Sequence, residues 1–135
     1  MLSSPLTDPS SETTAKPRLL VVDDDVEIVA ELSEMLRAAK YEVVTANDPN
    51  EARRLILEDE AIGVIISDLR MPRQDGIEMI ESLGDIPELV NRPLRFIIIT
   101  GHGTLVEAQR SHRVQATDFL TKPLSPKDLL GAIER

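Results

Sequence analysis

The sequence predicts an α/β fold: a doubly wound parallel sheet of five strands, with five helices distributed over both faces. Short apolar runs rich in Val and Ile alternate with longer segments whose apolar residues recur at three- and four-residue spacing. The runs contain few polar residues, which is typical of parallel strands buried on both faces. Helical segments between successive strands favour crossover connections and a parallel sheet.

The first 17 residues are expected to form a disordered extension. Residues 1–17 are rich in Ser, Thr, Pro and Asp, so they offer little apolar surface to bury. The folded domain is predicted to span residues 18–135. A single domain of that size buries about two-thirds of the surface of its unfolded chain.

Two strands and two helices are predicted in the first half of the chain. Residues 19–22 form the first strand, and Asp24 or Asp25 caps a helix with the apolar stripe Ile28, Val29, Leu32, Met35 and Leu36. Residues 41–45 form the second strand. Residues 47–50 supply turn and cap residues, with Pro49 in the first turn of a helix whose apolar residues are Ala52, Leu55, Ile56 and Leu57.

Three more strands are predicted at residues 64–67, 95–99 and 116–120. The third helix begins after a loop at residues 72–76 and places apolar residues at three-residue spacing: Ile77, Ile80 and Leu83. Gly84, Pro87 and Pro93 interrupt the segment that follows. The fourth helix passes through Leu105, Val106 and Ala108. Ser125 and Pro126 open the last helix, which carries Leu129, Leu130 and Ile133.

The composition argues against several classes of function. A net charge of −9 argues against an electrostatic grip on DNA or anionic lipid by this domain. The chain has no cysteine and only two histidines, His102 and His112, so disulfides, thiol chemistry and a zinc site are not expected. Its N-terminus has no basic segment followed by a long apolar one, so a signal peptide is not expected. No apolar run reaches membrane-spanning length, and a cytoplasmic location is expected.

Polar residues collect where four of the predicted strands end. The first strand is followed by Asp23, Asp24 and Asp25, the third ends at Asp68, the fourth at Thr100, and the fifth is followed by Lys122. The carboxyl ends of parallel strands meet at one edge of a sheet, where ligands bind. Two carboxylates about 5 Å apart repel by roughly 3 kcal/mol at an effective dielectric near 20. Mg²⁺ would offset this repulsion, because it prefers oxygen ligands.

Beside such an ion, Asp68 is a candidate nucleophile for phosphorus, and Thr100 and Lys122 are candidate donors to phosphoryl oxygens. Each residue taken alone also fits a plainer role. The Asp run fits helix capping, Asp68 a turn, Thr100 the polar end of a strand, and Lys122 a loop. The plainer roles do not explain why these residues follow successive strands.

Residues 18–135 resemble a receiver domain of bacterial two-component response regulators, of the CheY-like type. The motifs that carry the resemblance are LVVDDD at 20–25, ISDLRMP at 66–72 with DG at 75–76, ITGHG at 99–103 and ATDFLTKP at 116–123. They occur in the family's order and spacing over nearly the whole chain beyond the extension. The resemblance implies a flavodoxin-like sheet with the strand order 2-1-3-4-5.

The resemblance also implies a role for each matching acid. Asp68 would be the phosphoacceptor. Asp24, together with Asp68 and the backbone carbonyl of Arg70, would bind Mg²⁺, and Asp23 would contribute through water. Asp25 is not implied as a ligand, and helix capping is its expected role.

Three further residues have implied roles in switching. Thr100 would be the switch hydroxyl, Lys122 would pair with the phosphoryl group, and Phe119 would be the aromatic switch residue. The implied function is a phosphorylation-dependent switch that takes its phosphoryl group from a histidine kinase or histidine phosphotransfer protein. The domain would not be an enzyme with an external substrate, since it would only gain and lose a phosphoryl group at Asp68.

Two alternatives remain open. A magnesium-dependent phosphatase that forms an aspartyl phosphate needs a second acid two residues after its nucleophile, and Arg70 stands at that position. A receiver-like module that binds its partner without phosphorylation would not need the set Asp24, Asp68, Thr100 and Lys122.

The chain departs from the family pattern at Gln74, where an apolar residue is common, and at Gln115, where Gly is common. The stretch 84–95 is also slightly longer than usual. The expected partners are the phosphodonor protein and an effector, which is either a C-terminal domain of a longer chain or a separate protein. Self-association through the last two helices and the fifth strand is a further expectation. No direct binding to nucleic acid or membrane is expected of this domain.

Overall fold

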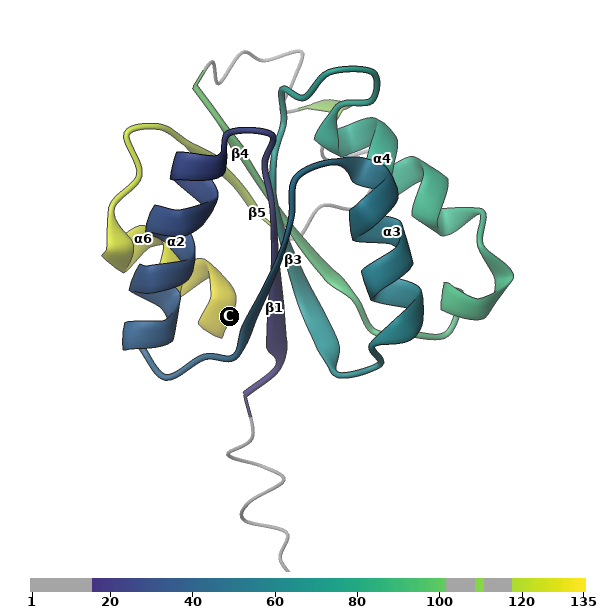
Figure 1. The fold of residues 1–135 in the computed structure, drawn as a ribbon, viewed down its shortest axis with the longest axis horizontal. Coiled ribbons are helices and arrows are strands. Elements are labelled where there is room, and N and C mark those ends of the chain that lie inside the picture. Colours follow the sequence, from purple (N-terminus) through teal and green to yellow (C-terminus); the bar gives the residue numbers. More distant parts are fainter. Residues whose placement is uncertain (1–15, 102–108, 111–117) are drawn as a thin grey trace, which may run out of the picture.

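The computed structural model describes residues 16–101, 109–110 and 118–135. Its sheet has five parallel strands in the order β2-β1-β3-β4-β5 (Figure 1). The fold class and the strand order are therefore confirmed. The strands are β1 (Arg18–Val22), β2 (Val43–Ala46), β3 (Ile62–Asp68), β4 (Arg95–Thr100) and β5 (Asp118–Thr121).

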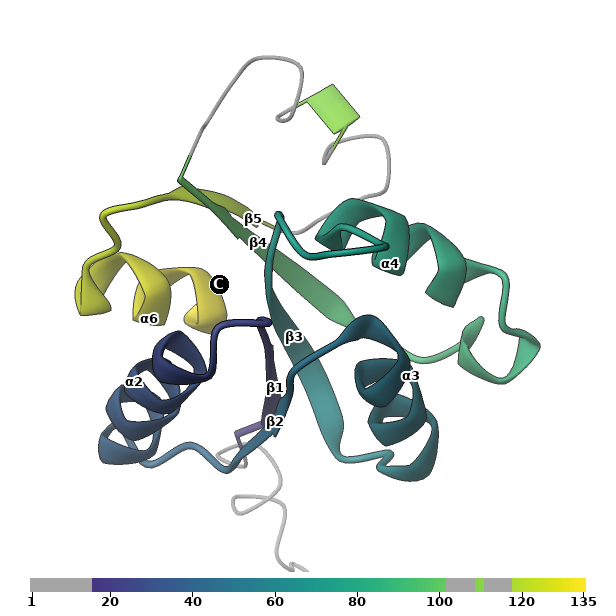
Figure 2. The same ribbon diagram turned by 45° about the horizontal axis from the view of Figure 1, so that its top comes forward.

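Helices cover both faces of the sheet, as the turned view in Figure 2 shows. Helices α2 (Val26–Ala38) and α6 (Pro126–Glu134) pack on one face, and α3 (Pro49–Glu58) and α4 (Gly76–Gly84) pack on the other. Successive residues of β1 point to opposite faces, so Leu19 and Val21 enter the first core while Leu20 and Val22 enter the second. Strands buried on both faces explain why these runs lack polar residues.

The helices begin where polar cap residues stand in the sequence. Asp25 caps α2 and Asp48 caps α3, each by accepting hydrogen bonds from backbone N–H groups of the first turn. Asp75 and Glu78 form a capping box at α4, and Ser125 caps α6. These caps all lie at the carboxyl edge of the sheet, because each helix follows a strand.

The structure corrects two details of the sequence analysis. The second strand was predicted at residues 41–45, but β2 spans Val43–Ala46. The chain is still closing helix α2 at Tyr41, whose N–H donates to the carbonyl of Leu36 after Lys40 adopts a φ of 76°. Leu57 was placed in the apolar stripe of the second helix, but 41% of it is exposed.

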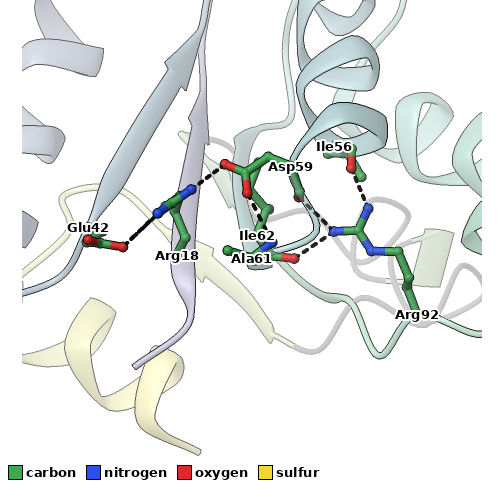
Figure 3. A network of polar contacts seen from close by, with 7 residues as sticks. All are labelled: Arg18, Glu42, Ile56, Asp59, Ala61, Ile62 and Arg92. Atoms are coloured by element: carbon green, nitrogen blue, oxygen red, sulfur yellow. Dashed lines mark hydrogen bonds and ion pairs between the residues drawn. The ribbon is translucent and has the colours of Figure 1, made fainter. Parts of the chain in front are cut away.

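The stretch between α4 and β4 contains a short 3-10 helix, η1 (Pro87–Leu89), which the sequence analysis did not predict. Leu89 packs into the core on the α3–α4 face. Arg92 then donates to the carbonyls of Ile56, Asp59 and Ile62 (Figure 3). This segment is thus fastened to the amino edge of the sheet.

Several predictions fall on residues outside the described part of the chain. These are the disorder expected over residues 1–15, most of the fourth helix, and the first two residues of the fifth strand. Among the helices that are described, none is both long and apolar enough to cross a membrane.

Candidate metal and phosphoacceptor site

Three carboxylates meet at the carboxyl edge of the sheet. Asp23 and Asp24 follow β1, and Asp68 ends the neighbouring strand β3. One oxygen from each of these side chains lies within 4.8 Å of the others. The structure thereby brings the adjacent pair Asp23 and Asp24 together with Asp68, which lies about 45 residues further along the sequence. We call these three residues the acidic cluster.

Local hydrogen bonds fix the first two acids. Asp23 is only 3% exposed, and its Oδ1 accepts a hydrogen bond of 2.9 Å from the backbone N–H of Asp25. The side chain of Asp25 turns away to cap α2, as the sequence analysis expected for it. Asn47, at the end of β2, donates from Nδ2 to the carbonyl of Asp23 over 3.4 Å.

Asp68 is held between a cation and the backbone. The Lys122 ammonium lies 3.2 Å from Oδ1 of Asp68, and the backbone N–H of Arg70 also bonds to this carboxylate. Gly76, the first residue of α4, lies directly behind: a Cβ there would come within 2.7 Å of the carbonyl oxygen of Asp68. Position 76 therefore requires a residue without a side chain beside Asp68.

The pKa values of Asp23 and Asp68 both lie above the usual range of a carboxyl group. Burial, together with the nearby charge of Asp68, raises the pKa of Asp23 to about 6, although the N–H of Asp25 counteracts the rise. Burial also raises the pKa of Asp68, and the charge of Asp24 adds to this, while Lys122 and the N–H of Arg70 lower it. Both carboxyls thus bind a proton more readily than a carboxyl in water does.

The acidic cluster fits a divalent cation. Its donors are all carboxylate oxygens, which hard cations such as Mg²⁺ prefer. Burial and the neighbouring carboxylates both disfavour the charged forms of Asp23 and Asp68, and a bound cation would favour them. The sequence-predicted ligands Asp23, Asp24 and Asp68 are those that the structure brings together.

The other predicted residues lie around the cluster. Thr100 ends β4, is fully buried, and follows Ile99, which is paired with Asp68 across the sheet. Phe119 in β5 is half-buried and packs against an apolar group on the α4 side of the sheet: Leu69, Ile77, Ile80 and Ile98. The side chain of Arg70 is exposed.

Two hollows open beside the acidic cluster. One, of about 260 Å³, is lined by Asp23, Asp68 and Lys122 together with apolar residues of α2 and of the segment that follows β5. The other, of about 490 Å³, lies between the start of α3 and the β3–α4 loop (residues 69–75), with Asp24 in its lining. Both give a second molecule access to the cluster.

Two residues that support the site were not found from the sequence. Asn47 was expected only as a turn or cap residue, yet it contacts the backbone of Asp23. Arg53 was given no role, yet it donates to Gln74 in the β3–α4 loop. A polar residue at the end of β2 was the only available signal for Asn47. Nothing in the spacing of the sequence marks Arg53.

A five-stranded sheet of this order, with an acidic cluster and a lysine at its carboxyl edge, defines the class of CheY-like receiver domains. Comparison with known families agrees, since the model of the response regulator receiver domain matches residues 19–134. The chain belongs to this family.

The chain is similar to two proteins whose names describe them as regulators. The chain is 35% identical to the two-component response regulator PprB of Pseudomonas aeruginosa over 87% of its own length and 42% of PprB. It is also 35% identical to the transcriptional regulatory protein FixJ of Rhizobium meliloti, over 85% of its length and 54% of FixJ. The chain thus spans about half the length of these relatives.

Among solved structures, the chemotaxis protein CheY4 of Vibrio cholerae superposes with a TM-score of 0.81 at 31% identity, covering 90% of this chain and 98% of CheY4. This match extends over essentially all of the smaller protein. It supports assignment of the described fold to one receiver domain.

Proposed function

We propose that Asp68 accepts a phosphoryl group from the phosphohistidine of a sensor histidine kinase or histidine phosphotransfer protein, in a reaction that depends on Mg²⁺. The observation that carries this proposal is the environment of Asp68. Its carboxylate lies within 4.8 Å of two further acids that can hold a cation, and 3.2 Å from the Lys122 ammonium.

The chain's own residues have distinct tasks in this reaction. An oxygen of Asp68 forms the new O–P bond as the N–P bond of phosphohistidine breaks, and the electron pair returns to the imidazole nitrogen, which takes up a proton from solvent. Lys122 then pairs with the phosphoryl oxygens, and Thr100 donates its hydroxyl to them.

Asp23, Asp24, Asp68 and the carbonyl of Arg70 would hold Mg²⁺, directly or through water. The ion would supply positive charge that neutralises the phosphoryl oxygens and the acids together. Arg70 occupies the position at which aspartyl-phosphate phosphatases carry an acid, so Asp68 stores the phosphoryl group rather than turning over a substrate.

The acyl phosphate adds about two negative charges at Asp68, by analogy with other phosphorylated side chains. We expect Thr100 to turn toward this charge and Phe119 to rotate into the vacated space. The surface formed by β5 and the helices on either side of it then changes. Moving such an equilibrium from 1:99 to 99:1 requires about 5.5 kcal/mol, which a few charge-assisted hydrogen bonds can supply.

This surface would bind the effector, either a further domain of a longer chain or a separate protein, and would serve for self-association. The similarity to PprB and FixJ, which extend well beyond the matched region, supports an effector on a longer chain. We place the domain in the cytoplasm with its kinase, and assign it no direct contact with nucleic acid or membrane.

The test is phosphorylation by a small donor. Incubation with Mg²⁺ and acetyl phosphate or phosphoramidate should add one phosphoryl group, measured by intact mass. Asp68→Asn should abolish the adduct, whereas Asp59→Asn, at the opposite edge of the sheet, should keep it. A wild-type protein that gains no adduct from either donor would refute the proposal, and absence of Mg²⁺ binding as well would favour a module that acts without phosphorylation.

A further inference from the structure

Helix α3 and the residue that precedes its cap contact both of the segments that carry the acidic cluster. On one side, Asn47, which precedes α3, donates to the carbonyl of Asp23 over 3.4 Å. On the other side, Arg53, one turn into α3, donates from Nη2 to Oε1 of Gln74 over 3.1 Å. Gln74 belongs to the β3–α4 loop, which begins directly after Asp68.

The guanidinium of Arg53 joins three segments of the chain. Besides Gln74, it donates from Nη1 to Oδ1 of Asn50 (2.8 Å) in its own helix and from Nη2 to Oγ of Ser82 (3.4 Å) in α4. All three acceptors are neutral oxygens, and the side chain is half-buried. The planar fork of a guanidinium suits such a task, because it fixes several acceptors relative to one another.

The β3–α4 loop needs an anchor of this kind. Arg73 has a φ of 72°, a conformation that costs a residue with a side chain about 1–2 kcal/mol. Leu69 and Met71 are the buried apolar residues of this loop. The hollow of about 490 Å³ beside Asp24 has both Arg53 and Gln74 in its lining. Side chains do not fill the space between α3 and the loop there, and the hydrogen bond from Arg53 to Gln74 connects the two.

The same loop reaches the reacting carboxylate. The backbone N–H of Arg70 bonds to Asp68, and the loop is closed by a bond of 2.8 Å from the N–H of Gly76 to the carbonyl of Leu69. Only three residues separate Gln74 from Arg70, so a shift of Gln74 would move the backbone N–H that bonds to the Asp68 carboxylate.

We propose that Arg53 is a positioning residue: through Gln74 it fixes the β3–α4 loop relative to Asp24 and thereby sets the affinity of the acidic cluster for Mg²⁺. This inference rests on the proposed function, because it assigns a supporting contact to the same site. Arg53 touches neither the metal nor the phosphoryl group.

The experiment compares Arg53→Met with Arg54→Met. Arg54 is the next residue of α3, but its side chain is exposed and pairs with Glu58 along the helix at 3.1 Å. The Mg²⁺ dissociation constant is measured by titration calorimetry with MgCl₂ on the whole chain. Supporting contacts of metal ligands change affinity about 10- to 100-fold, and Arg53 acts from further away, so we expect Arg53→Met to weaken binding about three- to tenfold. Arg54→Met should bind as the wild type does.

A double-mutant cycle separates positioning from general destabilisation. Gln74→Met should weaken Mg²⁺ binding as Arg53→Met does, and the double variant should be no weaker than either single variant. With acetyl phosphate, the initial rate of each single variant should fall at limiting Mg²⁺ and recover at saturating Mg²⁺, which a loss of folded protein would not produce. Gln74→Met carries the test alone if Arg53→Met does not fold.

Equal Mg²⁺ affinities of Arg53→Met and Arg54→Met, or losses that add in the double variant, would overturn the inference. Those results leave the wild-type protein able to bind Mg²⁺ and accept a phosphoryl group. A wild type that does neither is a different outcome, which overturns the proposed function and the inference with it.

Discussion

The two edges of the sheet arrange charge in opposite ways. At the carboxyl edge, three carboxylates crowd together with one lysine beside them. At the amino edge, Arg18 lies between two acids, 2.9 Å from Glu42 and 2.7 Å from Asp59, and Arg92 donates to three backbone carbonyls (Figure 3). Every charge drawn at that edge has an opposite charge or a carbonyl dipole next to it.

The pKa values of the carboxyl groups Asp59 and Asp23 shift in opposite directions at the two edges. The hydrogen bond from Arg18 holds the pKa of Asp59 below its usual value, whereas burial raises that of Asp23 to about 6. At neutral pH the amino edge therefore adds to the free energy of unfolding, while the carboxyl edge subtracts from it. The local loss of stability thus falls at the edge where the proposed function requires a cation and a phosphoryl group to bind.

The largest effect on stability is expected from Arg92→Met. Three carbonyls at the end of α3 and the start of β3 lose their donor, so the free energy of unfolding should fall by about 2–4 kcal/mol. Urea denaturation measures the change, with the exposed Arg54→Met as control. A loss no greater than that of the control would show that the amino edge does not stabilise the fold in this way.

Asp23→Asn should stabilise the protein, whereas Arg92→Met destabilises it. In Mg²⁺-free buffer at pH 7 it removes a buried charge whose folded pKa is about 6, so we expect stability to rise by about 1–2 kcal/mol. The wild type should gain stability between pH 7 and pH 5 as Asp23 takes up its proton, and the variant should lack that gain. Parallel pH profiles of the two proteins would contradict the raised pKa.

Asp59→Asn should destabilise the protein by about 1 kcal/mol at pH 7, because a partly exposed ion pair and the bond to the N–H of Ala61 are weakened. The folded pKa lies below the unfolded one, so this contribution is present above about pH 4 and disappears as the pH falls through the folded value. Denaturation at pH 7 and pH 3 measures it. A difference from wild type that is as large at pH 3 would indicate a cause other than charge.

The smallest effect is expected from Ser33→Ala in α2. The Ser33 hydroxyl is buried and has no hydrogen-bond partner among the described residues, so its removal should stabilise the protein by about 0.5–1 kcal/mol. Ser82→Ala is the matched change in α4, where the hydroxyl donates to the carbonyl of Met79 over 2.7 Å, and it should not stabilise. Thermal denaturation shows whether each variant is more or less stable than the wild type. A loss of stability in Ser33→Ala would show that the Ser33 hydroxyl makes a hydrogen bond after all.

The sequence predicted the structure best where a single local pattern, such as an apolar run or a polar residue after it, determines an element. Apolar runs indicated where the strands lie. Polar residues after them narrowed the first cap to Asp24 or Asp25 and the second to residues 47–50, and the structure has Asp25 and Asp48 as the caps. The assembly of Asp23 and Asp24 with Asp68 was predictable because parallel strands place their carboxyl ends at one edge.

Contacts between distant segments could not be predicted in this way. The donors at Arg53 and Arg92 bind a side-chain amide and backbone carbonyls on other elements, and neither partner is marked by spacing or periodicity. The shift of β2 has a similar origin, since the chain at Tyr41 follows the end of α2 rather than its own strand propensity.

The close approach of Gly76 to strand β3 limits the residues that can replace it. Its backbone lies so close to β3 that an added Cβ would meet the Asp68 carbonyl at 2.7 Å and the Ser67 hydroxyl at 3.0 Å. In a library of random variants selected for signalling, we expect position 76 to tolerate as few replacements as Asp68 itself. A survey of tolerated residues alone would then rank a glycine with no side-chain functional group beside the proposed phosphoacceptor, although what sets this position apart is the absence of a Cβ.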